Sequence, residues 1–152
     1  MSWIDDAVWF IRKDQRAQRI NAAARARKDQ VISEKRAGYW AVVSDAIRAS
    51  GSRWNVELGG QLGPMQVRDE AGGLRCNVIS GPTVVRVNPG EDGLTIAVQD
   101  GRAESRTTLI YDLDDREEMV VRSGHRILEV DDVVGRALEP IVFPNGRYPE
   151  LR

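Results

Sequence analysis

The feature that most constrains this chain is a long N-terminal stretch without a helix breaker. Residues 3 to about 49 contain no proline, and their only glycine is Gly38. One helix of this length would extend for about 70 Å, whereas a compact domain of this size has a diameter of about 40 Å. We therefore expect the helix either to break, near residues 29–33 or at Gly38, or to project beyond its own domain.

Apolar residues recur at helical spacing at both ends of this stretch. The second group, between Ile32 and Ile47, is suited to cover a sheet. Residues 12–30 between the two groups are mostly charged or alanine and have little to bury. An exposed apolar patch is rarely left bare on a monomer, so we predict a protein contact at the first group. That group is Trp3, Ile4, Val8, Trp9, Phe10 and Ile11.

From about residue 50 the apolar period changes from helical to alternating. Trp54, Val56 and Leu58 alternate, which predicts a first strand, and a weaker strand at residues 62–67 is placed at a sheet edge by Pro64. Further short alternating runs, separated by glycine-rich turns, continue to residue 130 with no helix between them. This spacing is typical of an antiparallel meander. A short helix is expected from Asp131, with Pro140 as its end.

The sequence therefore predicts one α+β domain over residues 1–152. Its parts are a helical arm at 1–49, an antiparallel sheet at 50–130, and a short helix with an irregular tail at 131–152. The expected fold is a long N-terminal helix packed on a curved antiparallel β-meander of about six to eight strands, followed by a short C-terminal helix.

Charge and cysteine content exclude several classes of function. The net charge is −1, and the cations of residues 12–36 surround the helix among acidic residues, so we do not expect nucleic acid as a partner. Residues 1–49 carry a local charge of +4 and residues 50–152 one of −5, so the two parts attract each other weakly. Cys76 is the only cysteine, and we interpret it as a buried thiol that behaves as a small hydrophobe.

Three features bear on where the protein acts. The single cysteine favours a reducing compartment, the first residues do not resemble a signal peptide, and no apolar run is long enough to cross a bilayer. We expect a cytoplasmic protein without a transmembrane segment. Arginine greatly outnumbers lysine, which suggests a GC-rich bacterial genome.

Two features invite a search for catalytic chemistry. The acidic cluster at residues 112–118 resembles paired carboxylates, but its spacing does not match a calcium-binding loop, and a solvated turn explains it. His125 is the only histidine, and no partner group for it is evident in the sequence. We find no phosphate-binding loop, nucleophile elbow or zinc-ligand pattern, and we expect no cofactor or metal.

The leading hypothesis is a non-enzymatic binding protein that self-associates, as a homodimer or larger oligomer, or docks a protein partner through its N-terminal helix. A second hypothesis is a carrier for a small apolar ligand, lined by residues 54–58, 94–98 and 107–113. Native mass spectrometry of freshly purified protein tests it, because a carrier retains mass that denaturation removes. A third is an enzyme that uses the cluster 112–118 with His125, which requires those groups to face one cleft.

Overall fold

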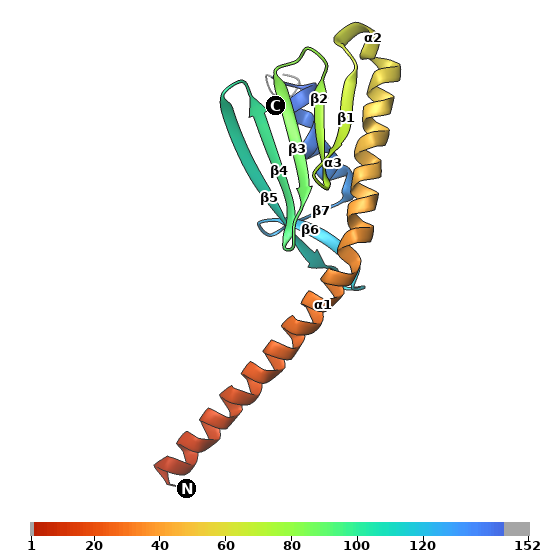
Figure 1. Ribbon diagram of the computed structural model, residues 1–152. Helices are drawn as coiled ribbons and strands as arrows, with labels where there is room; N and C mark the ends of the chain where they lie inside the picture. Colours follow the sequence, from red (N-terminus) through yellow and green to blue (C-terminus); the bar gives the residue numbers. More distant parts are fainter. Residues whose placement is uncertain (1, 145–152) are drawn as a thin grey trace.

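The computed structural model describes residues 2–144, and it consists of a long helix, a seven-stranded sheet and a shorter helix (Figure 1). No helix in this range is both long and apolar enough to span a bilayer. The predicted irregular tail lies mostly outside the described residues. The elements are α1 (Trp3–Glu57), α2 (Gly59–Leu62), β1 (Met65–Glu70), β2 (Gly73–Val78), β3 (Thr83–Pro89), β4 (Gly93–Asp100), β5 (Ala103–Leu113), β6 (Met119–Ser123), β7 (Arg126–Leu128) and α3 (Val130–Val142).

Helix α1 is continuous over 55 residues, which corresponds to about 82 Å. It passes through Gly38 and through residues 29–33 without a break, so the second of the two expected arrangements, projection beyond the domain, is the one observed. The helix bends as it leaves the sheet (Figure 1).

The predicted strand at residues 54–58 is wrong, because α1 continues to Glu57. Trp54 and Leu58 are four residues apart and therefore also share one side of a helix. The Trp54 indole Nε1 donates a hydrogen bond to the Gly63 carbonyl at 3.0 Å, and Val56 between them is 85% exposed. Gly51 lies inside the helix rather than in a turn and is buried against Val67 of β1.

The strands form an open antiparallel meander in the order β1-β2-β3-β4-β5-β6-β7. This confirms the predicted fold class, and β1 lies at an edge as the proline at its start indicates. Tight turns with Gly72, Gly101 and Gly124 at positive φ connect three of the strand pairs. Helix α3 starts at Val130 and includes Pro140 in its last turn, so Pro140 does not end it.

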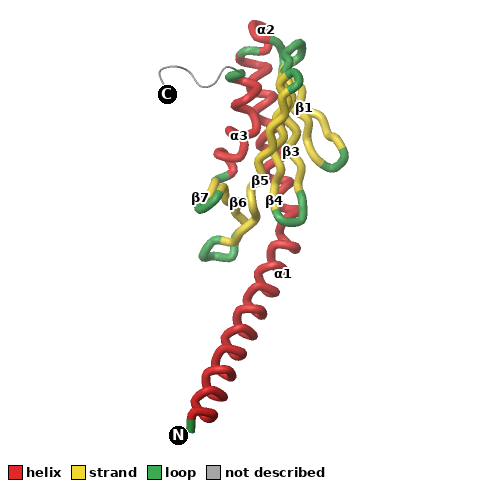
Figure 2. Tube along the Cα trace, turned by 90° about the vertical axis from the view of Figure 1, so that its left-hand side faces the viewer, coloured by secondary structure: helices red, strands yellow, loops and turns green. Residues whose placement is uncertain are grey.

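The core lies between one face of the sheet and the two helices. Figure 2 shows α1 and α3 on the same side of the strands, while the opposite face is left open. The most deeply buried large side chains come from the C-terminal half of α1, from six strands and from α3: Val43, Ile47, Leu74, Cys76, Val85, Val87, Leu94, Leu109, Val121, Leu128 and Val133. We call this unit, residues 31–144, the body.

Candidate interaction surface

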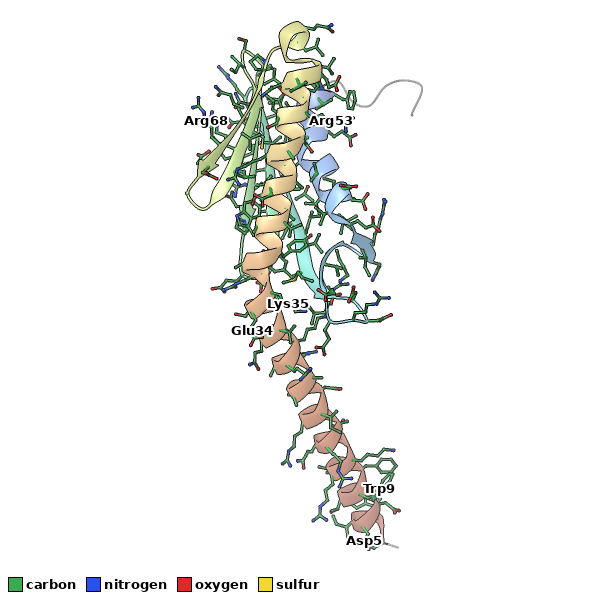
Figure 3. All side chains as sticks on the ribbon, turned by 90° about the vertical axis from the view of Figure 1, so that its right-hand side faces the viewer. Asp5, Trp9, Glu34, Lys35, Arg53 and Arg68 are labelled. Carbon is green, nitrogen blue, oxygen red and sulfur yellow. The ribbon has the colours of Figure 1, made fainter. Side chains whose placement is uncertain are left out.

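The first 24 residues of α1, residues 3–26, project from the body into solvent, and we call them the arm (Figure 3). The arm begins with a capping box, in which the Asp5 amide donates to the Ser2 hydroxyl and the Ser2 amide donates to the Asp5 carboxylate at 3.2 Å. The Ser2 hydroxyl also donates to this carboxylate at 2.7 Å, and these hydrogen bonds lower the pKa of Asp5. The arm therefore has a defined start and is about 36 Å long.

The end of the arm, residues 3–11, is the tip, and it contains all six residues predicted to make a protein contact. All six are exposed, from 39% for Val8 to 81% for Trp3. At about 100° per residue, five of them and the half-buried Ala7 lie within one half of the helix surface. Trp9 lies on the other side, where its ring meets Phe10 edge to face at 5.0 Å and the Lys13 ammonium at 4.9 Å from its centroid.

The base of the arm is held by ion pairs to the end of β5 and to the turn between β5 and β6. The Lys28 Nζ lies 2.5 Å from Asp112 Oδ1, and Arg27 Nη2 lies 3.1 Å from Glu117 Oε1. Lys35 donates to the Glu117 carbonyl at 2.6 Å. Basic residues of α1 thus contact the acidic cluster. This agrees with the attraction expected between the positive N-terminal part of the chain and its negative remainder. The sequence alone did not identify these pairs.

Asp112 is the best-enclosed carboxylate of this contact, with its side chain only 17% exposed. Burial alone raises its pKa, but hydrogen bonds from Lys28 and from the Leu113 amide, together with the charges of Lys28 and Arg122, outweigh it. The net effect is a lowered pKa. Arg122 Nε lies 2.5 Å from the other carboxylate oxygen, Asp112 Oδ2, so the carboxylate bridges α1 to β6.

The groups named in the enzyme hypothesis lie in two different turns. Asp114 accepts hydrogen bonds from the amides of Arg116 and Glu118, which shapes the acidic turn. His125 is exposed in the β6–β7 turn, at the other end of β6. Within residues 2–144 no group of three or more His, Cys, Asp or Glu side chains could hold a metal ion. The cluster and His125 are therefore not brought together.

Cys76 is fully buried in β2, as predicted, and burial raises the pKa of its thiol to about 11. It is therefore protonated at neutral pH and a poor nucleophile. The predicted interpretation as a small hydrophobe is confirmed.

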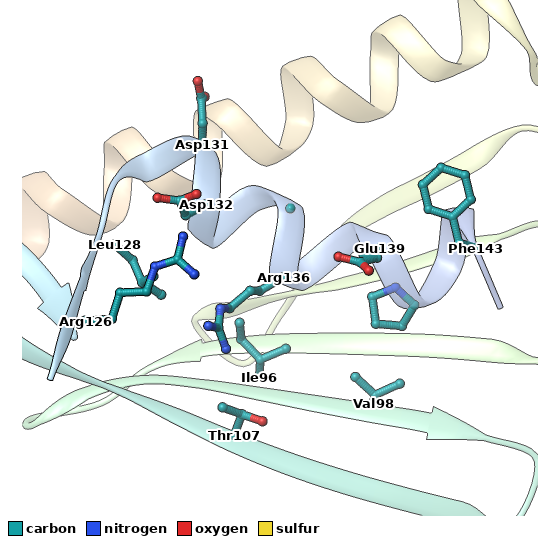
Figure 4. A pocket seen from close by; sticks show the side chains of 12 residues that line it. Ile96, Val98, Thr107, Arg126, Leu128, Asp131, Asp132, Arg136, Glu139 and Phe143 are labelled. Atoms are coloured by element: carbon teal, nitrogen blue, oxygen red, sulfur yellow. The ribbon is translucent and has the colours of Figure 1, made fainter. Parts of the chain in front are cut away.

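A groove of about 520 Å³ separates α3 from β4, β5 and β7 (Figure 4). Its lining includes the apolar Ile96, Val98 and Leu128 and the charged Arg126 and Asp132. The two sheet segments named for the carrier hypothesis, 94–98 and 107–113, contribute to it. Residues 54–58 do not, because they belong to α1 or directly follow it. The carrier hypothesis stays a prediction.

No family model, no curated protein and no solved structure matches this chain.

Proposed function

We propose that this is a non-enzymatic interaction protein whose tip binds the tip of a second copy of the same chain. The observation that carries this proposal is the apolar tip itself. Six large apolar residues within residues 3–11 are exposed, and the tip is separated from the body by the rest of a rigid helix. Fully burying one such side chain contributes about 1.5–3 kcal/mol, so a few of them offset a substantial part of the entropy of association.

Charge along the arm supports an antiparallel pair. Asp5 and Asp6 lie at the start of the arm, whereas the cations begin with Arg12 and Lys13. When two arms run in opposite directions, the acidic start of each lies beside the basic segment of the other. In a parallel pair, like charges would face each other. A twofold axis between the tips would make the two contacts identical and close the assembly at two copies.

The pair buries the apolar side of the tip and leaves the other side of the arm in solvent. Ile11 belongs to the apolar side. Ile20 is nine residues further along, so it points in the opposite direction, and it is similarly exposed at 63%. Ile11→Glu and Ile20→Glu make the same chemical change on opposite sides of the arm. Comparing them therefore distinguishes the loss of the apolar contact surface from the loss of any exposed isoleucine.

The test measures molecular mass by light scattering over a range of protein concentrations. We expect the wild type and Ile20→Glu to form dimers, and Ile11→Glu to shift the equilibrium toward monomer by at least about tenfold, because a charge would be buried in the contact. A wild type that stays monomeric at high concentration contradicts the proposal. So does an Ile11→Glu variant that dimerises as well as Ile20→Glu, because it would place the contact elsewhere.

A further inference from the structure

Four arginines form a straight row across the sheet. In the registers of the strand pairs, Arg68 of β1 lies opposite Arg75 of β2, and Arg75 lies opposite Arg86 of β3. Arg86 lies opposite Ala97 of β4, and Ala97 lies opposite Arg106 of β5. Each strand from β1 to β5 therefore contributes one residue to the row, and only the fourth residue is not an arginine.

The row lies on the open face of the sheet, away from both helices. Arg75 stands between Leu74 and Cys76, which are both buried on the helix side, and Arg86 stands between two buried valines in the same way. Successive side chains of a strand point to opposite faces, so the arginines point outward. In Figure 3, Arg68 lies on the left of the strands, whereas α1 runs along their right-hand side.

The charges of this row are only half compensated within the molecule. Arg86 Nε lies 3.5 Å from Glu70 Oε1, and Arg106 Nε lies 3.1 Å from Glu104 Oε1. Arg68 and Arg75 make no ion pair or side-chain hydrogen bond with any residue in the range 2–144. The Nε atom of Arg75 is buried and has no hydrogen-bond acceptor among residues 2–144. These two unpaired guanidinium groups lie directly opposite each other.

Such an arrangement weakens the fold. Like charges at directly opposed positions on neighbouring strands repel each other, and a buried donor without an acceptor is unfavourable. Ion pairing within the molecule therefore does not explain three consecutive arginines in one cross-strand row. An anionic partner would remove both penalties at once, because guanidinium groups bind carboxylates and phosphates through paired hydrogen bonds.

We propose that the open face binds an acidic polypeptide segment that lies across the strands along this row. Neighbouring strands are about 4.8 Å apart, so the row from β1 to β5 spans about 19 Å. In an extended peptide, side chains of one face recur every ~6.7 Å, so four acidic residues at alternating positions span about 20 Å. The flexible arginine side chains take up the difference in spacing. Ala97, which is only 8% exposed, lies between Arg86 and Arg106 and adds no charge of its own to the row.

Two observations favour a short acidic peptide over a nucleic acid. Proteins that bind single strands stack bases on aromatic side chains, and the only aromatic residue in the seven strands is Tyr111, which is buried on the helix side against Tyr39. Residues 50–152 carry a net charge of −5, so a long polyanion that extended beyond the row would be repelled. A segment with about four carboxylates stays within the row.

The test uses the full chain and a fluorescein-labelled peptide of about nine residues in which glutamate and serine alternate, at about 0.05 M salt, with binding followed by fluorescence anisotropy. The peptide with glutamine in place of glutamate is the ligand control. A short single-stranded oligonucleotide and a duplex of similar length are measured in parallel. We expect the acidic peptide to bind, the glutamine peptide not to bind, and the oligonucleotides to bind at least about tenfold more weakly than the peptide.

Four variants locate the site. Arg68→Gln and Arg75→Gln each weaken peptide binding at least about tenfold, because each removes charge-assisted hydrogen bonds. Ala97→Glu weakens it to a similar extent, because the new carboxylate pairs with the neighbouring arginines and occupies the peptide position. Arg53→Gln, on α1 and away from the open face (Figure 3), removes the same charge and leaves binding within about twofold of the wild type.

Thermal unfolding distinguishes a binding surface from a structural one. The midpoints of Arg68→Gln and Arg75→Gln equal or exceed that of the wild type, because repulsion is relieved. Absence of peptide binding by the wild type overturns the proposal, and so does unchanged binding by both arginine variants. A lowered midpoint in both shows that the row serves the fold. Tighter binding of an oligonucleotide that depends on the same arginines shows that the partner class is wrong.

Discussion

Asp112 lies where α1 separates from the body, and it joins Lys28 of the helix to Arg122 of β6. The remaining contacts of the arm base involve more exposed side chains, and exposed ion pairs contribute little in water. Asp112 is better enclosed, and it also accepts a hydrogen bond from the Leu113 amide at 2.8 Å. We therefore expect Asp112 to contribute more to the stability of this contact than the other acidic side chains do.

We expect Asp112→Asn to lower the free energy of unfolding by about 1–2 kcal/mol at neutral pH, because it leaves two cations without their anion. The pKa of Asp112 is lowered in the folded state, so its contribution is fully present above the unfolded pKa of about 4 and is lost as pH falls through the folded value. Denaturant unfolding at pH 7 and at about pH 3 measures this. The difference from wild type shrinks at the lower pH.

The matched control is Asp115→Asn, three residues further along in the turn after β5, because Asp115 makes no ion pair or side-chain hydrogen bond with residues 2–144. Its unfolding free energy stays within about 0.5 kcal/mol of the wild type. Equal effects of the two substitutions would mean that general charge, rather than the bridge, stabilises the turn.

At the scale of elements, helix α1 explains both what could be predicted from the sequence and what could not. The absence of proline from residues 3–49 predicted a long helix correctly, because helix propensity is local. Its end was misplaced because Ser50-Gly51-Ser52 resembles a turn. Gly51 is there for packing: a Cβ atom at this position would lie 2.9 Å from Val67 Cγ2, so glycine lets β1 approach the helix. Local pattern does not reveal that long-range contact.

The arginine row on the open face likewise shows what local sequence pattern can predict and what depends on long-range contacts. Alternation within each strand indicated which residues face away from the core, since Arg75 and Arg86 both stand between apolar neighbours. Their alignment depends on the registers of four strand pairs, and a shift of one residue in any pair would disrupt it. The tip could be predicted without the structure because helix periodicity alone defines it.

Two glycines of α1 provide a matched test of this packing. A Cβ atom at Gly38 would meet nothing within 4 Å, so Gly38→Ala should raise the unfolding free energy by about 0.5–1 kcal/mol through helix propensity. Gly51→Ala gains the same propensity but collides with the stiff, partly buried Val67, and we expect a net loss of about 1 kcal/mol. Thermal unfolding at equal protein concentration compares them. A stabilising Gly51→Ala would contradict the close approach of α1 and β1.

At the scale of the whole molecule, we expect the arm to contribute little to the free energy of unfolding of the body. Residues 3–26 are exposed apart from the half-buried Ala7, and the core contains no side chain from them. A chain that lacks residues 1–24 keeps Arg27, Lys28 and every core residue. We expect its unfolding free energy per body, measured at a concentration where the full chain is monomeric, to lie within about 0.5 kcal/mol of that of the full chain.

The same comparison at high concentration should give a different result. Because dimerisation stabilises the folded state by mass action, the unfolding midpoint of the full chain rises with protein concentration, whereas that of the truncated chain stays constant. A truncated chain that loses its cooperative transition at all concentrations would show that the arm supports the body directly.

The continuity of α1 has a consequence for geometry. Because the same uninterrupted helix lies against the sheet at one end and carries the tip at the other, the arm acts as a spacer of fixed length. Two arms of about 36 Å that overlap by about 20 Å, which places Asp5 and Asp6 beside Arg12 and Lys13 of the second copy, would hold two bodies roughly 50 Å apart. The two open faces would then lie at opposite ends of the paired helices. A partner with two acidic segments would bind the dimer more tightly than a monomer only if its segments could span that separation.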